Sequence, residues 1–250
     1  MITRVSATDN DLAPAAEPLM SVSGVTIERE GLPIVRDVSI GVWAGAITVL
    51  LGVNGAGKTT LIEGVSGAIP VAEGTVTLDG KEIHRLRPYR RAKLGLAHVE
   101  QGRSVFPELT TEENLRVAAG SRDIDQVFDL FPELRKRMSV NAGLLSGGEQ
   151  QMLVVARAML QEPRVLMLDE LSLGLAPLVV LRLMEAVAKL RDTGIGVLLV
   201  EQFASLALDI GTHAYILRSG EVVYSGDCAT LRDTDGLLHK LYLGDLETVG

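Results

Sequence analysis

The chain has 250 residues, 47% hydrophobic and 22% charged, values typical of a globular protein with one domain or one domain carrying an inserted subdomain. Its 24 basic and 32 acidic residues give a net charge of −8, which argues against a general nucleic-acid-binding surface. A single cysteine, Cys228, excludes an internal disulfide and any cysteine-cluster metal site.

The first 18 residues predict a disordered lead-in, because they hold no apolar core of signal-peptide length and include Asp9, Asn10, Asp11 and two prolines. Alternating patterns at 20–27, 38–42 and 75–78 then predict strands of an antiparallel portion. The longest apolar run, 42–53, is too short to span a bilayer, which needs about 20 residues.

Three further segments, 47–51, 165–168 and 197–200, are continuously apolar and predict strands buried on both faces of a mainly parallel sheet. The amphipathic helix predicted at 178–191 places Met184 in the core, and a late hairpin is expected at 215–217 and 221–224. Between Tyr89 and Leu145 the pattern changes to short helices with charged faces, apart from one strand at 95–99. This stretch predicts an inserted helical subdomain.

Residues 52–60, GVNGAGKTT, match the pattern G-x-x-x-x-G-K-[ST] of a phosphate-binding loop. Glycines let consecutive backbone N–H groups turn around an anion, and a helix that starts at Lys58 presents its positive dipole end to that anion. The Lys58 ammonium is expected at the β- and γ-phosphates and the Thr59 hydroxyl at Mg²⁺. The predicted nucleotide-binding residues of this loop are Gly52, Asn54, Gly55, Ala56, Gly57, Lys58, Thr59 and Thr60.

Two carboxylates, Asp169 and Glu170, follow the apolar strand 165–168. A carboxylate at the C-terminal end of a central strand can hold nucleotide-bound Mg²⁺, and the next residue can polarise an attacking water as a general base. Such a pair alone is often a solvated strand end. The upstream phosphate-binding loop favours Asp169 as a metal ligand and Glu170 as the general base.

The segment 145–151, LSGGEQQ, precedes a helical pattern that runs to Leu160. Ser146 can cap this helix, and with Gly147 and Gly148 it forms a second helix start able to bind an anion. The simpler alternative is a plain N-cap after a flexible turn. A second phosphate-binding helix start becomes useful when two such chains face each other and each supplies this segment to the other's nucleotide.

The phosphate-binding loop, LSGGEQQ and LMLDE, in this order and spacing, resemble the ATP-binding subunits of ABC transporters over about residues 19–244. The resemblance implies a P-loop NTPase fold of the ABC-ATPase type. This is an α/β fold over 19–250 with a mainly parallel core sheet, an N-terminal antiparallel β portion and an inserted helical subdomain at roughly 90–160. It further implies ATP and Mg²⁺ as ligands, and two ATPase subunits that close head-to-tail with ATP between one phosphate-binding loop and the other's LSGGEQQ.

Three more residues and one loop take their expected roles from this resemblance. Gln101 stands where the family's glutamine contacts Mg²⁺ and the attacking water and links to the permease. Gln202 falls at a catalytic switch position that is usually histidine, and the loop 172–177 would cross the interface between the ATPases. Arg29 stands near the position at which the family has an aromatic residue that stacks on adenine. Its guanidinium plane would stack on the base or remain solvated.

The segments QGR-x-x-FP-x-LT, LSGGEQQ, SLGLAP and VEQ together are similar to the smaller ATPase subunit of branched-chain amino-acid importers (the LivF type), which also carries glutamine at the switch position. The sequence departs from family patterns at Ala176, where an Asp is common, at Glu100 and Leu171, where proline is usual, and at Phe203. The resemblance implies an ATPase on the cytoplasmic face of the cell membrane that energises import of branched-chain or other hydrophobic amino acids. Its expected partners are a second ATPase forming a heterodimer, two transmembrane permeases and an extracytoplasmic solute-binding protein, without nucleic acid.

Other functions share part of this pattern. Importers of urea or other small polar solutes are close relatives of the LivF type, and a soluble single-cassette ATPase of cofactor assembly is a further alternative. ABC-type ATPases that act on ribosomes or DNA usually carry two cassettes or long coiled insertions, which this sequence does not have. A module that binds nucleotide without hydrolysis is disfavoured by Lys58, Thr59, Asp169 and Glu170.

Overall fold

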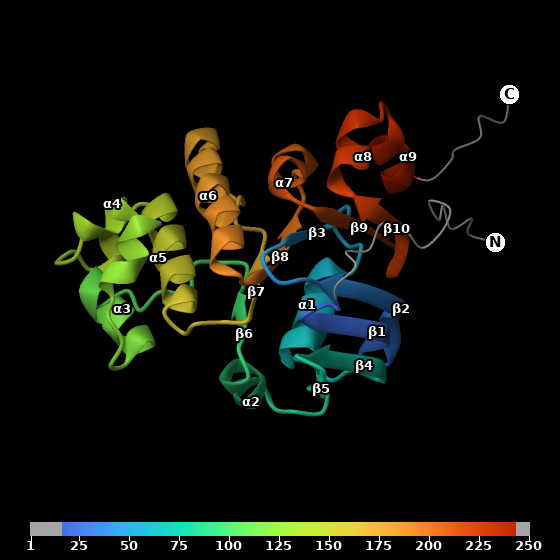
Figure 1. Cartoon of the computed structure of the whole chain (residues 1–250), viewed down its shortest axis with the longest axis horizontal. Helices are drawn as coiled ribbons and strands as arrows, with labels where there is room; N and C mark the ends of the chain where they lie inside the picture. Colours follow the sequence, from blue (N-terminus) through green and yellow to red (C-terminus); the bar gives the residue numbers. More distant parts are fainter. Residues whose placement is uncertain (1–16, 244–250) are drawn as a thin grey trace, which may run out of the picture.

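The structure, a computed structural model, describes residues 17–243, so the predicted lead-in at 1–18 lies outside the described residues except for its last two positions. The described residues form a four-stranded sheet and a six-stranded sheet. The six-stranded sheet lies between the four-stranded sheet and a layer of helices (Figure 1). Across residues 17–243, no helix combines the length and the apolar character needed to cross a membrane.

The first sheet is the predicted N-terminal antiparallel portion, with strand order β2-β1-β4-β5. Its strands are β1 (Met20–Arg29), β2 (Leu32–Val42), β4 (Glu73–Leu78) and β5 (Lys81–Glu82). The segment predicted at 38–42 is only the second half of β2. The first half escapes the alternating pattern because the pairing with β1 shifts register between Val35 and Val38, where Asp37 has a positive φ of 46°.

The second sheet is the predicted mainly parallel core, with strand order β10-β9-β3-β8-β7-β6. All its neighbouring strands run parallel except β9 and β10, which form the expected antiparallel hairpin. Its strands are β3 (Ile47–Leu51), β6 (Leu96–Val99), β7 (Val165–Asp169), β8 (Gly196–Glu201), β9 (His213–Arg218) and β10 (Glu221–Asp227).

The described helices comprise α1, which follows the phosphate-binding loop, helices that cover the parallel sheet, and a group that departs from that sheet. They are α1 (Lys58–Ser66), α2 (Pro88–Lys93), α3 (Thr111–Ala119), α4 (Pro132–Arg135), α5 (Gly147–Met159), α6 (Pro177–Lys189), α7 (Ala204–Ile210), α8 (Cys228–Asp233) and α9 (Leu237–Leu243), with 3₁₀ turns at Asp125–Asp129, Ala142–Leu144 and Leu190–Thr193. The helix predicted at 178–191 is α6 with its 3₁₀ extension, which ends at Gly194 in a left-handed conformation.

Helices α3, α4 and α5 form a group at the left of Figure 1, away from the antiparallel sheet. The expected range for the helical subdomain, roughly 90–160, also contains β6, which pairs with β7 in the parallel sheet. The helices that depart from that sheet begin after β6, at Thr111.

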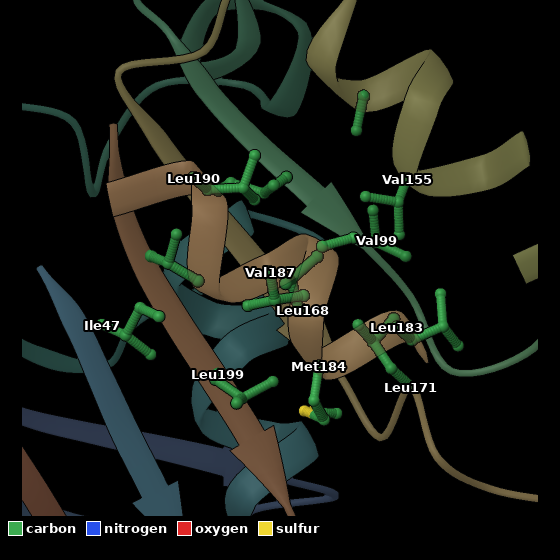
Figure 2. Close-up of a cluster of buried hydrophobic side chains, with 14 of the residues drawn as sticks. Ile47, Val99, Val155, Leu168, Leu171, Leu183, Met184, Val187, Leu190 and Leu199 are labelled. Atoms are coloured by element: carbon green, nitrogen blue, oxygen red, sulfur yellow. The ribbon is translucent and has the colours of Figure 1, made fainter. Parts of the chain in front are cut away.

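The continuously apolar strands are buried because alternate residues face two different cores. In β3, Ile47, Val49 and Leu51 pack in the core shared with α5, α6 and α7, whereas Leu50 packs toward α1 and the antiparallel sheet. Figure 2 shows Ile47 and other strand residues beside Met184 and Val187 of α6. Burying each such side chain contributes about 1.5–3 kcal/mol, so the sheet is a rigid platform for the loops at its edge.

Candidate functional site

The phosphate-binding loop joins the buried strand β3 to α1. Gly57, the N-cap of α1, has a φ of 104°, a conformation that side-chain-bearing residues rarely adopt, and therefore glycine is required there. No side chain caps α1, and its first turn holds no acidic residue. Because the first four N–H groups of a helix have no intrahelical acceptor, this end of α1 is a site for an anion.

The loop itself is braced from two directions. The Ala56 N–H donates to the Val53 carbonyl at 3.1 Å, and the Gly220 N–H, from the turn between β9 and β10, donates to the Ala56 carbonyl at 2.9 Å. Ala56, Gly57 and Lys58 are buried, whereas Asn54 and Gly55 are exposed. The tip of the loop is therefore open to a ligand while its base is fixed to the parallel sheet.

The Lys58 side chain lies inside its own loop and is only 4% exposed. Its Nζ donates to the Gly52 carbonyl at 2.9 Å and to the Val53 carbonyl at 3.4 Å. The same atom is 3.6 Å from Glu170 Oε1. Lys58 thus connects the phosphate-binding loop to the acidic pair at the end of β7.

Glu170 brings together residues from three distant parts of the sequence. Its Oε1 faces Lys58, and its Oε2 accepts a hydrogen bond from Gln101 Nε2 at 3.0 Å. Its backbone has a φ of 48°, which for a residue with a side chain costs about 1–2 kcal/mol. The Glu170 N–H donates to the Val200 carbonyl of β8 at 2.9 Å, which helps to hold this strained conformation.

Asp169, one residue earlier, is 1% exposed at the C-terminal end of β7. Its Oδ1 is buried without a hydrogen-bond partner among the described residues, and the nearby Thr59 hydroxyl acts to lower the pKa of this carboxyl. Burial, together with the neighbouring Glu170 charge, raises the pKa of Asp169 to about 6. An unpartnered buried carboxylate oxygen beside a hydroxyl is a set of oxygen donors that fits Mg²⁺.

The LSGGEQQ segment forms the N-terminus of α5, with Ser146 as its N-cap. Ser146 Oγ accepts from the Glu149 N–H at 3.3 Å, and Glu149 Oε2 accepts from the Ser146 N–H at 2.9 Å. Gly148 is buried against α6, where an added Cβ would lie 2.4 Å from Val179 Cγ1. Gly148 therefore has a packing role in addition to the expected role in anion binding.

The structure does not bring every predicted site residue to the phosphate-binding loop. Ser146, Gly147 and Gly148 lie on α5 in the helical group of Figure 1, and within residues 17–243 no hydrogen bond or ion pair joins them to 52–60. Gln202 is exposed after β8, and its side chain has no hydrogen-bond partner in the described part of the chain. Ser146 and Gln202 are exposed, whereas Gly148 is buried.

Arg29 lies at the end of β1 beside α1. Its Nε donates to Thr60 Oγ1 at 3.2 Å, and its guanidinium forms an ion pair with Glu63. The side chain is 46% exposed. Arg29 is therefore neither freely solvated nor unattached, since two residues of the helix that follows the phosphate-binding loop hold its guanidinium.

One residue of the site region had no assigned role in the sequence analysis. Glu201, at the end of β8, is 1% exposed and accepts hydrogen bonds from Ser172 Oγ at 2.6 Å and from the Ser172 N–H at 3.2 Å. Burial raises the pKa of Glu201, and the bonds from Ser172 oppose this rise. The sequence does contain a signal for Glu201, because it is a carboxylate directly after an apolar strand. Asp169 stands in the same way directly after the apolar strand 165–168.

Comparisons with known proteins identify the family of this chain. Residues 35–172 match the family model described as ABC transporter. The chain is 38% identical over 233 residues to the high-affinity branched-chain amino acid transport ATP-binding protein BraG of Pseudomonas aeruginosa, covering 90% of this chain and 100% of BraG. It is 42% identical over 221 residues to the probable branched-chain amino acid transport ATP-binding protein LivF of Archaeoglobus fulgidus, covering 85% of this chain and 93% of that protein.

The fold is also found among solved structures. A nucleotide-free ATP-binding cassette from an ABC transporter superposes with a TM-score of 0.80 at 22% identity, covering 91% of this chain and 99% of the other. The predicted combination of an antiparallel N-terminal sheet and a parallel core sheet is confirmed by the strand pairing and by this likeness. With its fold, its phosphate-binding loop and its relatives in agreement, the chain belongs to the ABC transporter family, as one of its ATP-binding, ATP-hydrolysing subunits.

Proposed function

We propose that this chain is the ATPase subunit of an importer for branched-chain or other hydrophobic amino acids, and that Glu170 is its general base. The substrate class is supported by two relatives at 38% and 42% identity whose names state branched-chain amino acid transport. The catalytic proposal rests on one observation, the Glu170 carboxylate held between Lys58 Nζ and Gln101 Nε2.

Binding of ATP would begin with its phosphates at the N-terminus of α1. The loop amides and the uncapped first turn of α1 supply N–H donors, and Lys58 supplies a positive charge within the same loop. A phosphate oxygen can replace the Gly52 and Val53 carbonyls as acceptor for Lys58 Nζ, since a charged acceptor makes the stronger hydrogen bond. Arg29, held by Thr60 and Glu63, is proposed to carry the adenine contact on its guanidinium face.

Asp169, Thr59 and Gln101 are the proposed Mg²⁺ site. Asp169 offers a buried oxygen without a hydrogen-bond partner among the described residues, and Thr59 offers a hydroxyl near that carboxylate. Mg²⁺ is commonly held by only one or two protein carboxylates, with phosphates and water completing its coordination. When bound, the ion neutralises negative charge on the β- and γ-phosphates.

Glu170 and Gln101 are proposed to act on the attacking water. Glu170 accepts a proton from the water as it approaches the γ-phosphorus, while the Gln101 amide orients the carboxylate and the water by hydrogen bonding. The Lys58 ammonium lies 3.6 Å from Glu170 Oε1 and so holds this carboxylate beside the phosphate-binding loop.

The Glu170→Gln variant tests this assignment. Glutamine keeps the size of the side chain but cannot take a proton, so ATP binding is expected to persist while hydrolysis falls about 10²–10⁴-fold. Single-turnover hydrolysis and nucleotide affinity are measured on the same preparation, with Glu185→Gln on α6 as the control for loss of a carboxylate elsewhere. An unchanged rate in Glu170→Gln would remove Glu170 from the mechanism.

The LSGGEQQ helix start is proposed to bind the γ-phosphate of a nucleotide held by a second ATPase subunit. Across residues 17–243 no hydrogen bond or ion pair joins it to the chain's own phosphate-binding loop, so we propose that its phosphate comes from a second subunit. Large apolar side chains are exposed in the segments expected at such an interface, namely Val53, Leu144, Leu173 and Phe203. We propose that the second subunit is a different ATPase.

The remaining partners are two transmembrane permeases and an extracytoplasmic solute-binding protein, which would place this chain at the cytoplasmic face of the membrane. A hollow of about 410 Å³ between α2, β6 and α5 is proposed to receive a permease segment. Its lining includes Tyr89, His98 and Glu100, and Glu100 directly precedes Gln101. A segment seated there would contact the backbone that positions Gln101. Co-purification with two permeases distinguishes this function from that of a soluble cofactor-assembly ATPase.

A further inference from the structure

We propose that Glu201 is a positioning residue for hydrolysis, because it holds the backbone on which Glu170 is mounted. The inference rests on the proposed role of Glu170 as general base and adds a residue to the machinery around it. Across residues 17–243, Glu201 forms no hydrogen bond or ion pair with Lys58 or Gln101, and both side-chain hydrogen bonds that it accepts come from Ser172, in the segment that follows Glu170. The Gln202 N–H and the Glu170 charge also act on the pKa of its carboxylate.

The contact between Glu201 and that segment is double and buried. Both carboxylate oxygens of Glu201 are used by one residue: Oε2 accepts from Ser172 Oγ at 2.6 Å and Oε1 from the Ser172 N–H at 3.2 Å. Glu201 is 1% exposed and Ser172 is 6% exposed. A bidentate contact fixes the direction of the bound group as well as its distance, so the Ser172 backbone has little freedom to rotate.

A buried carboxylate is a poor choice for stability alone. Its desolvation costs several kcal/mol, and a well-packed aliphatic residue in such a place is often neutral or stabilising. The five residues before it in β8, at 196–200, are all buried and carry no polar side chain. A carboxylate that ends such a strand is better explained by what it holds.

What it holds is the strained turn that carries Glu170. Glu170 has a φ of 48°, and such a conformation persists only where the surroundings over-determine it. Strand β8 supplies restraint on both sides of the turn: the Val200 carbonyl accepts from the Glu170 N–H at 2.9 Å, and Glu201 binds Ser172 two residues later. A third bond, from the Leu173 N–H to the Glu170 carbonyl at 3.2 Å, closes the turn.

Loss of the Glu201 contact would therefore release one side of the turn and let the Glu170 carboxylate move. A misplacement of about 1 Å in a reacting group can lower a rate about 10²-fold without removing any group that contacts substrate. Binding of the nucleotide phosphates depends on the loop at 52–60 and on α1. The backbone of Glu201 pairs with Leu51, next to this loop, but its side-chain hydrogen bonds go to Ser172, so phosphate binding should change little in Glu201→Ala.

The test compares Glu201→Ala, Glu201→Gln and Ser172→Ala in the full-length chain, in complex with the second ATPase subunit that completes its nucleotide site, by steady-state and single-turnover hydrolysis. Glu201→Ala is expected to lower kcat about 10–100-fold with KM for ATP changed less than about threefold. Glu201→Gln should stay within about threefold of the unmodified kcat, because its amide can accept from the Ser172 N–H and donate to Ser172 Oγ. Ser172→Ala should lower kcat by itself, and its effect should not add to that of Glu201→Ala.

Two controls separate positioning from stability. Leu198→Ala truncates a buried residue on the opposite face of β8, so it should lower the melting temperature while kcat per folded molecule stays unchanged. If Leu198→Ala lowers kcat as much as Glu201→Ala, or if Glu201→Ala leaves kcat intact, the inference is wrong. Should Glu201→Ala fail to fold, Ser172→Ala carries the same comparison, and an unchanged kcat there also overturns it.

The Glu170→Gln background separates this inference from the proposed function. If Glu201 acts through Glu170, adding Glu201→Ala to Glu170→Gln should slow single-turnover hydrolysis by less than about threefold. A further 10-fold loss would mean that Glu201 acts by another route. Normal hydrolysis in Glu170→Gln alone would contradict the general-base assignment, whereas slow hydrolysis there with normal hydrolysis in Glu201→Ala contradicts only the positioning role.

Discussion

At the scale of single residues, the Lys58 ammonium is held by carbonyl oxygens that a phosphate can replace. Lys58→Ala is expected to weaken ATP binding about 10–100-fold, the weight of one or two charge-assisted hydrogen bonds. Titration with a fluorescent ATP analogue measures the affinity, and Lys81→Ala, which removes an exposed cation elsewhere, is the control. Equal affinities for Lys58→Ala and Lys81→Ala would contradict a phosphate contact.

Asp169 gives the site a pH dependence of known sign. Its pKa is about 6 in the folded chain against an ordinary 3.8, so the folded state binds the proton more tightly than the unfolded state. Its contribution to stability is therefore most favourable below about pH 4 and is lost as the pH rises through 6, a loss of up to about 3 kcal/mol. Asp169→Asn cannot ionise, and without metal it should be more stable than the unmodified chain at about pH 8.

The check is denaturant unfolding in EDTA at several pH values. The advantage of Asp169→Asn should shrink as the pH falls from about 7 to about 4, because the unmodified carboxyl then becomes protonated. With Mg²⁺ and ATP present the order should reverse, since only the carboxylate offers the metal an ionised oxygen. An advantage that is constant with pH would show that the gain comes from packing and not from the Asp169 charge.

At the scale of secondary-structure elements, the sequence predicts structure best where a local residue pattern has a single physical explanation. Strands at 47–51, 165–168 and 197–200 are recognisable because burial on both faces demands unbroken apolar runs, and β3 begins and ends as predicted. Capping of α5 by Ser146 is equally local, since the donor and acceptor are three residues apart. The loop at 52–60 is predictable because its glycines and Lys58 together form a local pattern that serves one purpose, the binding of a phosphate anion.

Other features depend on contacts between residues far apart in the sequence. The hydrogen bond between Glu201 and Ser172 spans 29 positions, and the one between Gln101 and Glu170 spans 69. No periodic pattern in the sequence can predict contacts over such separations. The family resemblance supplied Gln101 but left Glu201 without a role. The shift of register near Asp37 likewise hid the first half of β2, because a bulge breaks the alternation on which strand prediction depends.

The N-terminus of α5 can be tested as an element, because α3 carries the same device. Ser146 with Glu149 and Thr110 with Glu113 each form a complete capping box. Ser146→Arg and Thr110→Arg should each cost about 1 kcal/mol of stability through the lost cap. If the start of α5 binds γ-phosphate across an interface, only Ser146→Arg should also abolish pairing of subunits in the presence of ATP, while ATP binding by the isolated chain persists.

Size-exclusion chromatography with light scattering measures the pairing, in a Glu170→Gln background so that ATP is not consumed. Pairing that survives in Ser146→Arg would contradict the phosphate role of the α5 start. Equal loss of pairing in both variants would mean that helix stability, not phosphate binding, is responsible. Loss of nucleotide binding in the isolated Ser146→Arg chain would mean that Ser146 only holds the fold.

At the scale of the whole molecule, we propose that the chain presents two halves of different nucleotide sites. One proposed half contains its phosphate-binding loop, Glu170 and Gln202, and the other contains the LSGGEQQ helix start at the beginning of α5. A switch histidine can change its protonation near neutral pH, whereas Gln202 is a neutral amide with fixed donor and acceptor ends. If the partner ATPase carries histidine there, as we propose, the two composite sites are chemically unequal.

This inequality predicts unequal tolerance of substitution. Replacing the partner's switch histidine by alanine should reduce transport more than Gln202→Ala does, because only the histidine site loses a group that can carry a proton or a charge near the γ-phosphate. Uptake by the reconstituted transporter, with ATP hydrolysis measured in parallel, compares the two variants directly. A homodimer is the competing arrangement, in which Gln202 serves both sites as a hydrogen-bond donor. Purification of an active transporter containing two copies of this chain and no second ATPase would decide for the homodimer, because every site would then contain Gln202.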